Sequence, residues 1–112
     1  FNPLLILRND KIITLKADRM PIGIYHQNNI DFTSHEIDLN SGDMLYLYTD
    51  GYPDQFGGEE DKKFTTRQFR NVLLDIHQKP MMVQKIILEN TMEKWMNGTE
   101  QLDDITVMGI RI

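Results

Sequence analysis

Cysteine is absent from this chain of 112 residues. Its absence excludes disulfide frameworks, thiolate zinc sites and cysteine nucleophiles together, and it is compatible with a reducing compartment, so we expect the chain in the cytoplasm. A metal site, if the chain has one, must use oxygen or imidazole ligands. Long apolar runs are absent too, because none approaches the ~20 residues that span a bilayer, and no signal peptide is visible.

Positive charge is scarce. Lysine and arginine together number 12 against 17 aspartates and glutamates, which leaves a formal net charge of −5. This balance argues against nucleic acid or an anionic membrane surface as the main partner. With 40% hydrophobic and 26% charged residues, the composition is that of one globular domain at most. The first residue is Phe1 rather than methionine, so we expect the chain to be part of a longer protein.

The beginning of the chain is predicted to form a β-hairpin. Residues 4–8 and 11–16 are the two strands, because Asn9 and Asp10 between them tolerate the positive φ angles that a tight turn requires. The proline and glycine of residues 21–23 then interrupt the pattern and predict a loop.

The clearest strand is residues 44–49. Apolar side chains alternate onto both of its faces, so we expect a central strand that is covered on both sides. Residues 32–39 are a further strand candidate. The polar stretch 52–63, in which two glycines precede a run of acidic residues, is predicted to be a solvent-facing loop.

Two consecutive helices are predicted next. The first begins at Thr65 as N-cap, with Gln68 at the third helical position to complete a capping box, and the second runs from about residue 80 to 97. Residues 105–112 form the last strand. Because the strands are joined by short turns, the predicted fold class is α+β, a mainly antiparallel sheet with two consecutive helices packed on one face.

Acidic residues stand at two strand ends. Asp50 directly follows the strand 44–49, and Asp103 and Asp104 directly precede the last strand. If these strands are antiparallel neighbours, the carboxylates of Asp50 and Asp103 meet at one end of the sheet. Converging carboxylates repel one another unless a cation lies between them, and Mg²⁺ and Mn²⁺ favour such oxygen ligands. The alternative is that all of them are ordinary turn residues, and spacing alone favours that alternative.

Four short segments carry a resemblance to a known family. Residues 42–51, GDMLYLYTDG, resemble the GD-x-L-x-LYTDG segment of the SpoIIE/RsbU-like branch of the metal-dependent PPM serine/threonine phosphatases. Residues 103–107, DDITV, resemble the DDIT segment of that domain, residues 20–23 its PLG segment, and residues 2–5 its NPP-x-L segment. The four segments follow in the same order as in the family. The resemblance implies a partial PPM-type β-sandwich with the layers αββα.

The same resemblance implies roles for individual residues. Asp50 and Asp103 match the catalytic aspartates that bind a pair of Mn²⁺ or Mg²⁺ ions, whose bound water attacks the phosphorus atom. Gly51 and Asp104 are implied to lie next to these ligands without binding the metal ions themselves. Asp54 matches an acidic position that often follows the TDG triplet, and it is a third candidate for a place next to the ligands. The alternative is that Asp54 is a solvated loop carboxylate.

One segment of the family does not occur in the chain. The D-x-x-GHG segment, which supplies a bridging aspartate and a glycine carbonyl to both metal ions, is absent, and we expect it upstream of Phe1. Residues 1–112 would then be the C-terminal part of the phosphatase domain, with its upstream part missing. We expect this part alone to bind a metal ion weakly or not at all, to be inactive, and to self-associate through exposed apolar surface.

The function implied is that of a bacterial signalling phosphatase that hydrolyses phosphoserine or phosphothreonine on a protein. Substrates in this branch are typically anti-sigma-factor antagonists, and the phosphatase is attached to sensory or receiver domains, in a cytoplasmic protein or on the cytoplasmic side of a membrane-anchored sensor. The alternative is a non-catalytic regulatory or protein-interaction module with the same fold. A receiver domain is excluded, because there the aspartate pair comes first. The histidines are scattered without ligand spacing, at His26, His35 and His77.

Overall fold

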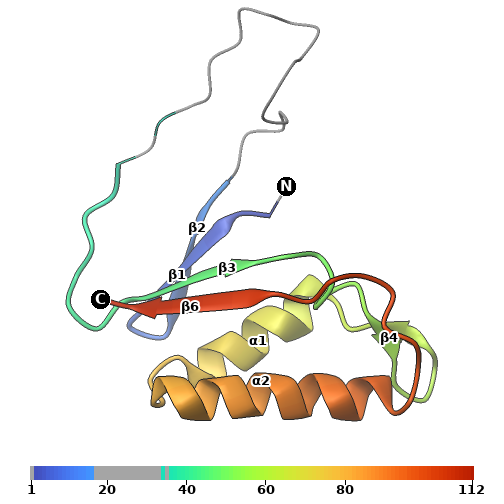
Figure 1. The fold of residues 1–112 in the computed structure, drawn as a ribbon. Coiled ribbons are helices and arrows are strands. Elements are labelled where there is room, and N and C mark those ends of the chain that lie inside the picture. The colour runs from blue at the N-terminus through green and yellow to red at the C-terminus, as the bar shows by residue number, and fades with distance from the viewer. Residues whose placement is uncertain (1, 17–33, 35) are drawn as a thin grey trace, which may run out of the picture.

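The computed structural model of the chain describes residues 2–16, 34 and 36–112. Within these residues the elements follow one another as three strands, a small two-stranded ribbon, two helices and a last strand (Figure 1). They are β1 (Leu4–Arg8), β2 (Lys11–Leu15), β3 (Met44–Tyr48), β4 (Phe56–Gly57), β5 (Lys62–Lys63), α1 (Thr66–Ile76), α2 (Met81–Met96) and β6 (Val107–Arg111).

Four of the strands form one antiparallel sheet in the order β2-β1-β3-β6. The predicted hairpin of β1 and β2 is confirmed, and its turn places Asn9 and Asp10 at φ angles of 51° and 59°. β3 lies between β1 and β6, so its predicted central position in the sheet is confirmed. β3 and β6 are antiparallel neighbours, with Tyr48 opposite Val107.

Both helices cover the same face of this sheet (Figure 1). The core lies between the two layers, where completely buried side chains of the sheet such as Leu5 and Tyr46 share one apolar cluster with Phe69 and Leu73 of α1 and Met92 of α2. The predicted α+β architecture, an antiparallel sheet with two consecutive helices on one face, is therefore confirmed. Neither helix in the described part of the chain is long and apolar enough to cross a bilayer.

The other face of the sheet is apolar and is open along β3 and β6, although Ile6 of β1 on the same face is completely buried. The register of β3 and β6 places Leu45 and Leu47 on this face, opposite Ile110 and Met108. Leu47, Met108 and Ile110 are between 43% and 52% exposed. The prediction that the strand 44–49 is covered on both sides is therefore wrong within the described residues, because the two helices are consecutive and pack together on one side.

The stretch 52–63 is only in part the predicted solvent-facing loop. Residues 58–63 are exposed, but the stretch contains the antiparallel ribbon of β4 and β5, and Tyr52 and Gln55 at its beginning are at most 2% exposed. The indole ring of Trp95 on α2 explains the difference, since it lies against this segment and its Nε1–H donates to the carbonyl oxygen of Gln55 at 2.8 Å. Gly57 fits there because a Cβ atom on it would lie 2.1 Å from the carbonyl oxygen of Trp95.

The predicted strand 32–39 is also wrong where it can be compared. Ser34 and residues 36–39 form no strand, and Ile37 and Leu39 remain 37% and 39% exposed. Both neighbouring positions beside β3 are occupied by β1 and β6, so the sheet offers this stretch no place next to the strand that follows it. The remaining positions of that prediction, and the predicted loop 21–23, lie outside the described residues.

The helix start at Thr65 is confirmed. Its hydroxyl oxygen accepts a hydrogen bond from the backbone N–H of Gln68 at 3.2 Å, which satisfies one of the free N–H groups of the first turn. The side chain of Gln68 donates to the carbonyl oxygen of Phe64 instead of closing the capping box on the N–H of Thr65. The second helix begins after Pro80 and ends at Asn97, close to the predicted bounds.

Candidate functional site

The pairing of β3 with β6 brings the two acidic segments to the same end of the sheet. Asp50 follows β3 and Asp103 precedes β6, and the strands run in opposite directions. The ladder continues one step beyond the strands, because the N–H of Thr49 donates to the carbonyl oxygen of Thr106 at 3.0 Å. The predicted meeting of the two segments is therefore confirmed at the level of the backbone.

The hydroxyl of Thr49 connects these two segments by hydrogen bonds. It donates to the carbonyl oxygen of Asp104 at 2.8 Å and accepts from the N–H of Thr106 at 3.0 Å. The hydroxyl thus acts both as donor and as acceptor, and each of its partners is 55 or more positions away along the chain. We call this contact of Thr49 with Asp104 and Thr106 the Thr49 junction. It holds the TDG and DDIT segments in register.

Gly51 is a point of close contact between the segments. A Cβ atom on Gly51 would lie 2.1 Å from the carbonyl oxygen of Asp104 and 3.1 Å from the side chain of Ile105. The φ angle of Gly51 is not positive, so its backbone conformation is open to other residues. Glycine is needed at this position because of the space that Asp104 occupies.

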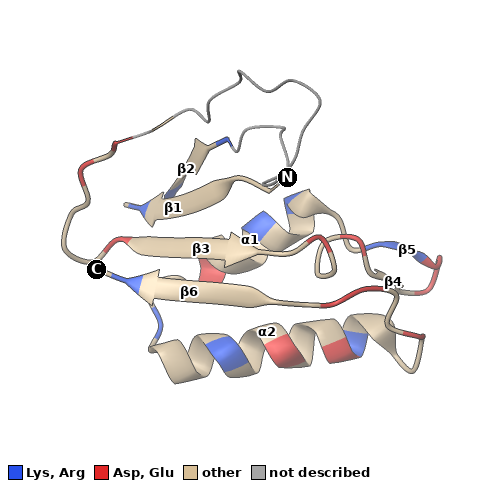
Figure 2. Cartoon of the chain, turned by 45° about the horizontal axis from the view of Figure 1, so that its top comes forward, with Lys and Arg blue, Asp and Glu red and all other residues tan. Residues whose placement is uncertain are grey.

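Figure 2 shows acidic positions in the chain after the end of β3 and before the start of β6. The acidic residues of these two segments, Asp50, Asp103 and Asp104, are all exposed. Asp103 uses one oxygen, Oδ1, to accept from the N–H of Asp104 at 2.8 Å. Among the described residues no three acidic or histidine side chains come close enough together to hold a metal ion. The donors available are nevertheless carboxylate oxygens of residues that follow β3 or precede β6, and such oxygens fit Mg²⁺ or Mn²⁺ in chemical kind.

The side chain of Asp54 has a different partner, on the β4–β5 ribbon. Its side chain is 53% exposed and lies 3.7 Å from the ammonium group of Lys63 on β5. The backbone N–H of Asp54 donates to the carbonyl oxygen of Asp50 at 2.9 Å and closes the turn after β3. An exposed ion pair of this kind contributes little stability. The observed contacts of Asp54 are those of a solvated loop residue.

The start of the chain also reaches this end of the sheet. The side-chain amide of Asn2, from the segment that resembles NPP-x-L, donates to the carbonyl oxygen of Tyr48 at 3.0 Å. Burial raises the pKa of the Tyr48 phenol, and the negative charge of Asp50 adds to that rise, whereas the positive charge of Arg70 opposes it. The buried Nε–H of Arg70 has no hydrogen-bond partner in the described structure.

Asp43, within the segment 42–51, has a role that the sequence did not indicate. Its carboxylate is buried and accepts from the guanidinium of Arg8, at 2.6 Å from Nη2 and 3.0 Å from Nε, and from the N–H of Asn40 at 2.8 Å. These hydrogen bonds hold the pKa of the Asp43 carboxyl below its usual value. The aspartate of the GD pair thus anchors the turn before β3 to β1, at the opposite end of β3 from Asp50.

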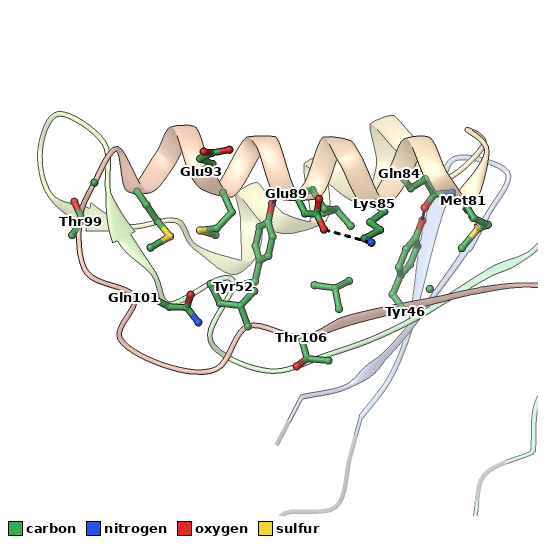
Figure 3. A pocket seen from close by; sticks show the side chains of 17 residues that line it. Tyr46, Tyr52, Met81, Gln84, Lys85, Glu89, Glu93, Thr99, Gln101 and Thr106 are labelled. Atoms are coloured by element: carbon green, nitrogen blue, oxygen red, sulfur yellow. Dashed lines mark hydrogen bonds and ion pairs between the residues drawn. The ribbon is translucent and has the colours of Figure 1, made fainter.

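A groove lies between α2 and the strand β6 (Figure 3). Its volume is about 810 Å³, and at one end the hydroxyl of Tyr46 donates to Oε1 of Gln84 at 2.6 Å. Apolar side chains such as Leu88 and Met92 line most of it. Thr106 of the Thr49 junction and its neighbour Ile105 line the groove, whereas none of Asp50, Asp103 and Asp104 is among the described residues that line it. The groove therefore adjoins the segment of Asp103 without including its carboxylates.

Histidine does not contribute to the junction in the described structure. His77 is 4% exposed at the end of α1, where its Nε2 lies 2.9 Å from the carboxylate of Asp10 in the β1–β2 turn. That contact joins the hairpin to the helix. His26 and His35 lie outside the described residues, as do residues 20–23, which resemble the PLG segment.

Comparison with known proteins places this arrangement in a family. The sequence model of the family described as Stage II sporulation protein E (SpoIIE) matches residues 1–112. The structure resembles the SiaA-PP2C domain of Pseudomonas aeruginosa, with a TM-score of 0.87 and 31% identity over 98% of this chain and 43% of that one. No curated protein matches the sequence significantly.

Two structures of SpoIIE from Bacillus subtilis share the fold. One is of the PP2C phosphatase domain with a fragment of the regulatory domain, with a TM-score of 0.70 and 22% identity over 99% of this chain and 31% of that one. The other is of the phosphatase domain presoaked with Mn, with a TM-score of 0.65 and 19% identity over 99% and 46%. The chain spans less than half the length of these solved structures. Since the family's sequence model covers the whole chain, the chain belongs to the SpoIIE family of PP2C-type phosphatase domains.

Proposed function

We propose that the protein containing this chain is a metal-dependent phosphatase that hydrolyses phosphoserine or phosphothreonine on a protein. The observation that supports this proposal most is the Thr49 junction, which sets the segments of Asp50 and Asp103 side by side although 53 positions separate them in the sequence. Hydrogen bonds that fix the backbone of both segments help to hold their carboxylates in the geometry that a preorganised site needs.

In this proposal Asp50 and Asp103 hold the metal ions, which are Mn²⁺ or Mg²⁺. A bound divalent cation supplies a nucleophile at neutral pH, because it lowers the pKa of a water molecule that it binds. The contribution of the chain is to fix its carboxylates in place. Thr49 and Gly51 do so through the backbone of Asp104, and the exposed side chains of Asp50 and Asp103 stay accessible to a cation and to a phosphorylated protein.

Residues 1–112 alone carry only part of the proposed site. Two carboxylate ligands give a small, hard cation few of the oxygen atoms that it requires. We therefore propose that this part of the protein binds Mn²⁺ weakly or not at all and does not hydrolyse phosphopeptides by itself. The alternative is a regulatory or protein-interaction module that keeps the fold without activity. In that case the complete protein is inactive too.

The proposed setting is bacterial signalling in the cytoplasm, in a cytoplasmic protein or on the inner side of a membrane-anchored sensor. The proposed substrate is a phosphoprotein of the anti-sigma-factor antagonist class, and the proposed input comes from sensory or receiver domains of the same protein. The net charge of −5 favours a protein substrate over nucleic acid.

The test uses the complete protein with Mn²⁺ and a phosphoserine peptide. Asp50→Asn and Asp103→Asn should each abolish hydrolysis and leave the circular dichroism spectrum unchanged, because the amide keeps the size of the side chain and removes its charge. Asp75→Asn, which changes an exposed acid on α1, is the matched control and should keep full activity. Near-normal activity of either ligand variant refutes the ligand assignment, and inactivity of the unsubstituted protein supports the regulatory alternative.

A further inference from the structure

Gln55 is a completely buried polar residue between the two acidic segments. It follows Asp50 by five positions, at the start of the β4–β5 ribbon, and its exposed fraction is 1%. A buried carboxamide is tolerated only when its donors and its acceptor are satisfied. The partners of this carboxamide therefore show what the residue holds.

Two of these partners lie in the segment that leads to Asp103. The Nε2 of Gln55 donates to the carbonyl oxygen of Glu100 at 2.9 Å, and its Oε1 accepts from the N–H of Leu102 at 3.3 Å. The second N–H of the amide donates to the carbonyl oxygen of Phe56 at 3.1 Å. These three hydrogen bonds fix the orientation of the amide, because a reversed amide would place N–H against N–H and oxygen against oxygen.

The backbone of Gln55 is itself firmly held. Its carbonyl oxygen accepts from the indole Nε1–H of Trp95 at 2.8 Å and from the N–H of Phe64 at 2.9 Å. Trp95 belongs to α2, and Phe64 directly precedes the N-cap of α1. Gln55 thus connects the packed helices to residues 100–102.

Residues 100–102 belong to no helix or strand. The chain between the end of α2 and the start of β6 is neither helix nor strand, and Leu102 is 61% exposed. On its C-terminal side Asp103 is followed by the Thr49 junction. On its N-terminal side the side chain of Gln55 binds the N–H of the residue directly before it. Asp103 therefore lies between two anchors, one at Thr49 and one at Gln55.

We propose that Gln55 is a positioning residue for Asp103, which sets the place of the Asp103 carboxylate relative to Asp50 through Glu100 and Leu102. The proposal rests on the proposed function, because it takes Asp103 to be a ligand of the metal ion. Gln55 does not touch the cation or the substrate. Its effect is on the geometry of a ligand. Loss of a group that hydrogen-bonds directly to a metal ligand typically lowers metal affinity about 10–100-fold, and we take this range for Gln55, which holds the residue before the ligand.

The experiment compares Gln55→Met with Gln84→Met in the complete protein. Gln84 is a matched control, since it is 2% exposed and its carboxamide donates to the carbonyl oxygen of Lys79 and accepts from the hydroxyl of Tyr46, away from the acidic segments. Mn²⁺ affinity is measured by calorimetry, and hydrogen exchange at Leu102 and Asp104 is measured without metal. Gln55→Asn, which keeps the amide on a shorter side chain, replaces Gln55→Met if the latter fails to fold.

We expect Gln55→Met to weaken Mn²⁺ binding about 10–100-fold and to speed exchange at Leu102, whereas Gln84→Met lowers thermal stability and changes neither quantity. Unchanged Mn²⁺ affinity in the Gln55 variant, or an equal loss in both variants, overturns the proposal. If the unsubstituted protein binds Mn²⁺ but hydrolyses no phosphopeptide, the proposed function fails while the affinities still decide the role of Gln55. Failure of the unsubstituted protein to bind Mn²⁺ overturns both.

Discussion

Substitution of Gly51 by alanine tests how closely the two acidic segments approach each other. The added Cβ atom would lie 2.1 Å from the carbonyl oxygen of Asp104, whereas Cβ atoms in proteins essentially never come within 3.0 Å of such an atom. The two segments must therefore separate by about 0.9 Å or more. The carbonyl oxygen that has to move is the acceptor of the Thr49 hydroxyl, so the Thr49 junction is strained by the same change.

The expected cost follows from these two effects. Overpacking of a close contact costs about 1–3 kcal/mol, and loss of the hydrogen bond from Thr49 to Asp104 adds about 0.5–1.5 kcal/mol. The free energy of unfolding should thus fall by about 2–4 kcal/mol. Misplacement of a catalytic group by about 1 Å lowers a rate about 100-fold, so we expect a loss of that size in Mn²⁺-dependent hydrolysis of a phosphopeptide.

The assay measures denaturant unfolding and phosphopeptide hydrolysis on the complete protein. Gly98→Ala is the control, because a Cβ atom there meets nothing within 4 Å, although the φ angle of +83° makes alanine unfavourable by about 1 kcal/mol. This control should lose some stability and no activity. If Gly51→Ala unfolds and hydrolyses like the unsubstituted protein, then steric contact with Asp104 is not the reason for glycine at this position.

Three further predictions concern the core, the buried carboxylate and the open sheet face. Phe69→Ala should lower the free energy of unfolding by about 3–5 kcal/mol in denaturant titrations, because the ring is completely buried between Tyr48 and Tyr52; a loss below about 1 kcal/mol contradicts this packing. Because hydrogen bonds from Arg8 hold the pKa of Asp43 below its usual value, the unfolded chain binds the proton more readily. The stabilisation is thus complete above about pH 4 and is lost as pH falls through the lower, folded-state pKa. In the Asp43→Asn variant the free energy of unfolding should fall less steeply as pH decreases below about 4. An unchanged pH dependence would mean that other groups cause the acid destabilisation. Residues 1–112 expressed alone should self-associate in sedimentation experiments, and Leu47→Glu combined with Met108→Glu should reduce this association, since both side chains lie exposed on the open sheet face; a monomer at high concentration contradicts the prediction.

Local patterns were sufficient for most elements of the fold. The hairpin turn at Asn9 and Asp10, the N-cap Thr65 and the two helices depend on residues within a few positions of each other, and each was predicted close to its observed place. The beginning of the stretch 52–63 was misjudged because its polar composition gives no sign that it is buried. Trp95, about 40 positions further along the chain, lies against Gln55, and no local pattern contains that contact.

The candidate site divides in the same way. The sequence alone was enough to place Asp50 just after a strand and to indicate the resemblance that makes Asp50 and Asp103 candidate ligands. The last strand begins at Val107 rather than at residue 105, so Asp103 lies further from it than predicted. Only the tertiary structure decided that Asp104 lies against Gly51 and that Gln55 holds the approach to Asp103, since both contacts join residues more than 40 positions apart. Such contacts form only when β3 pairs with β6 and α2 packs against the sheet. The type of each side chain was therefore readable from the sequence, whereas its partners depended on the packing of distant elements.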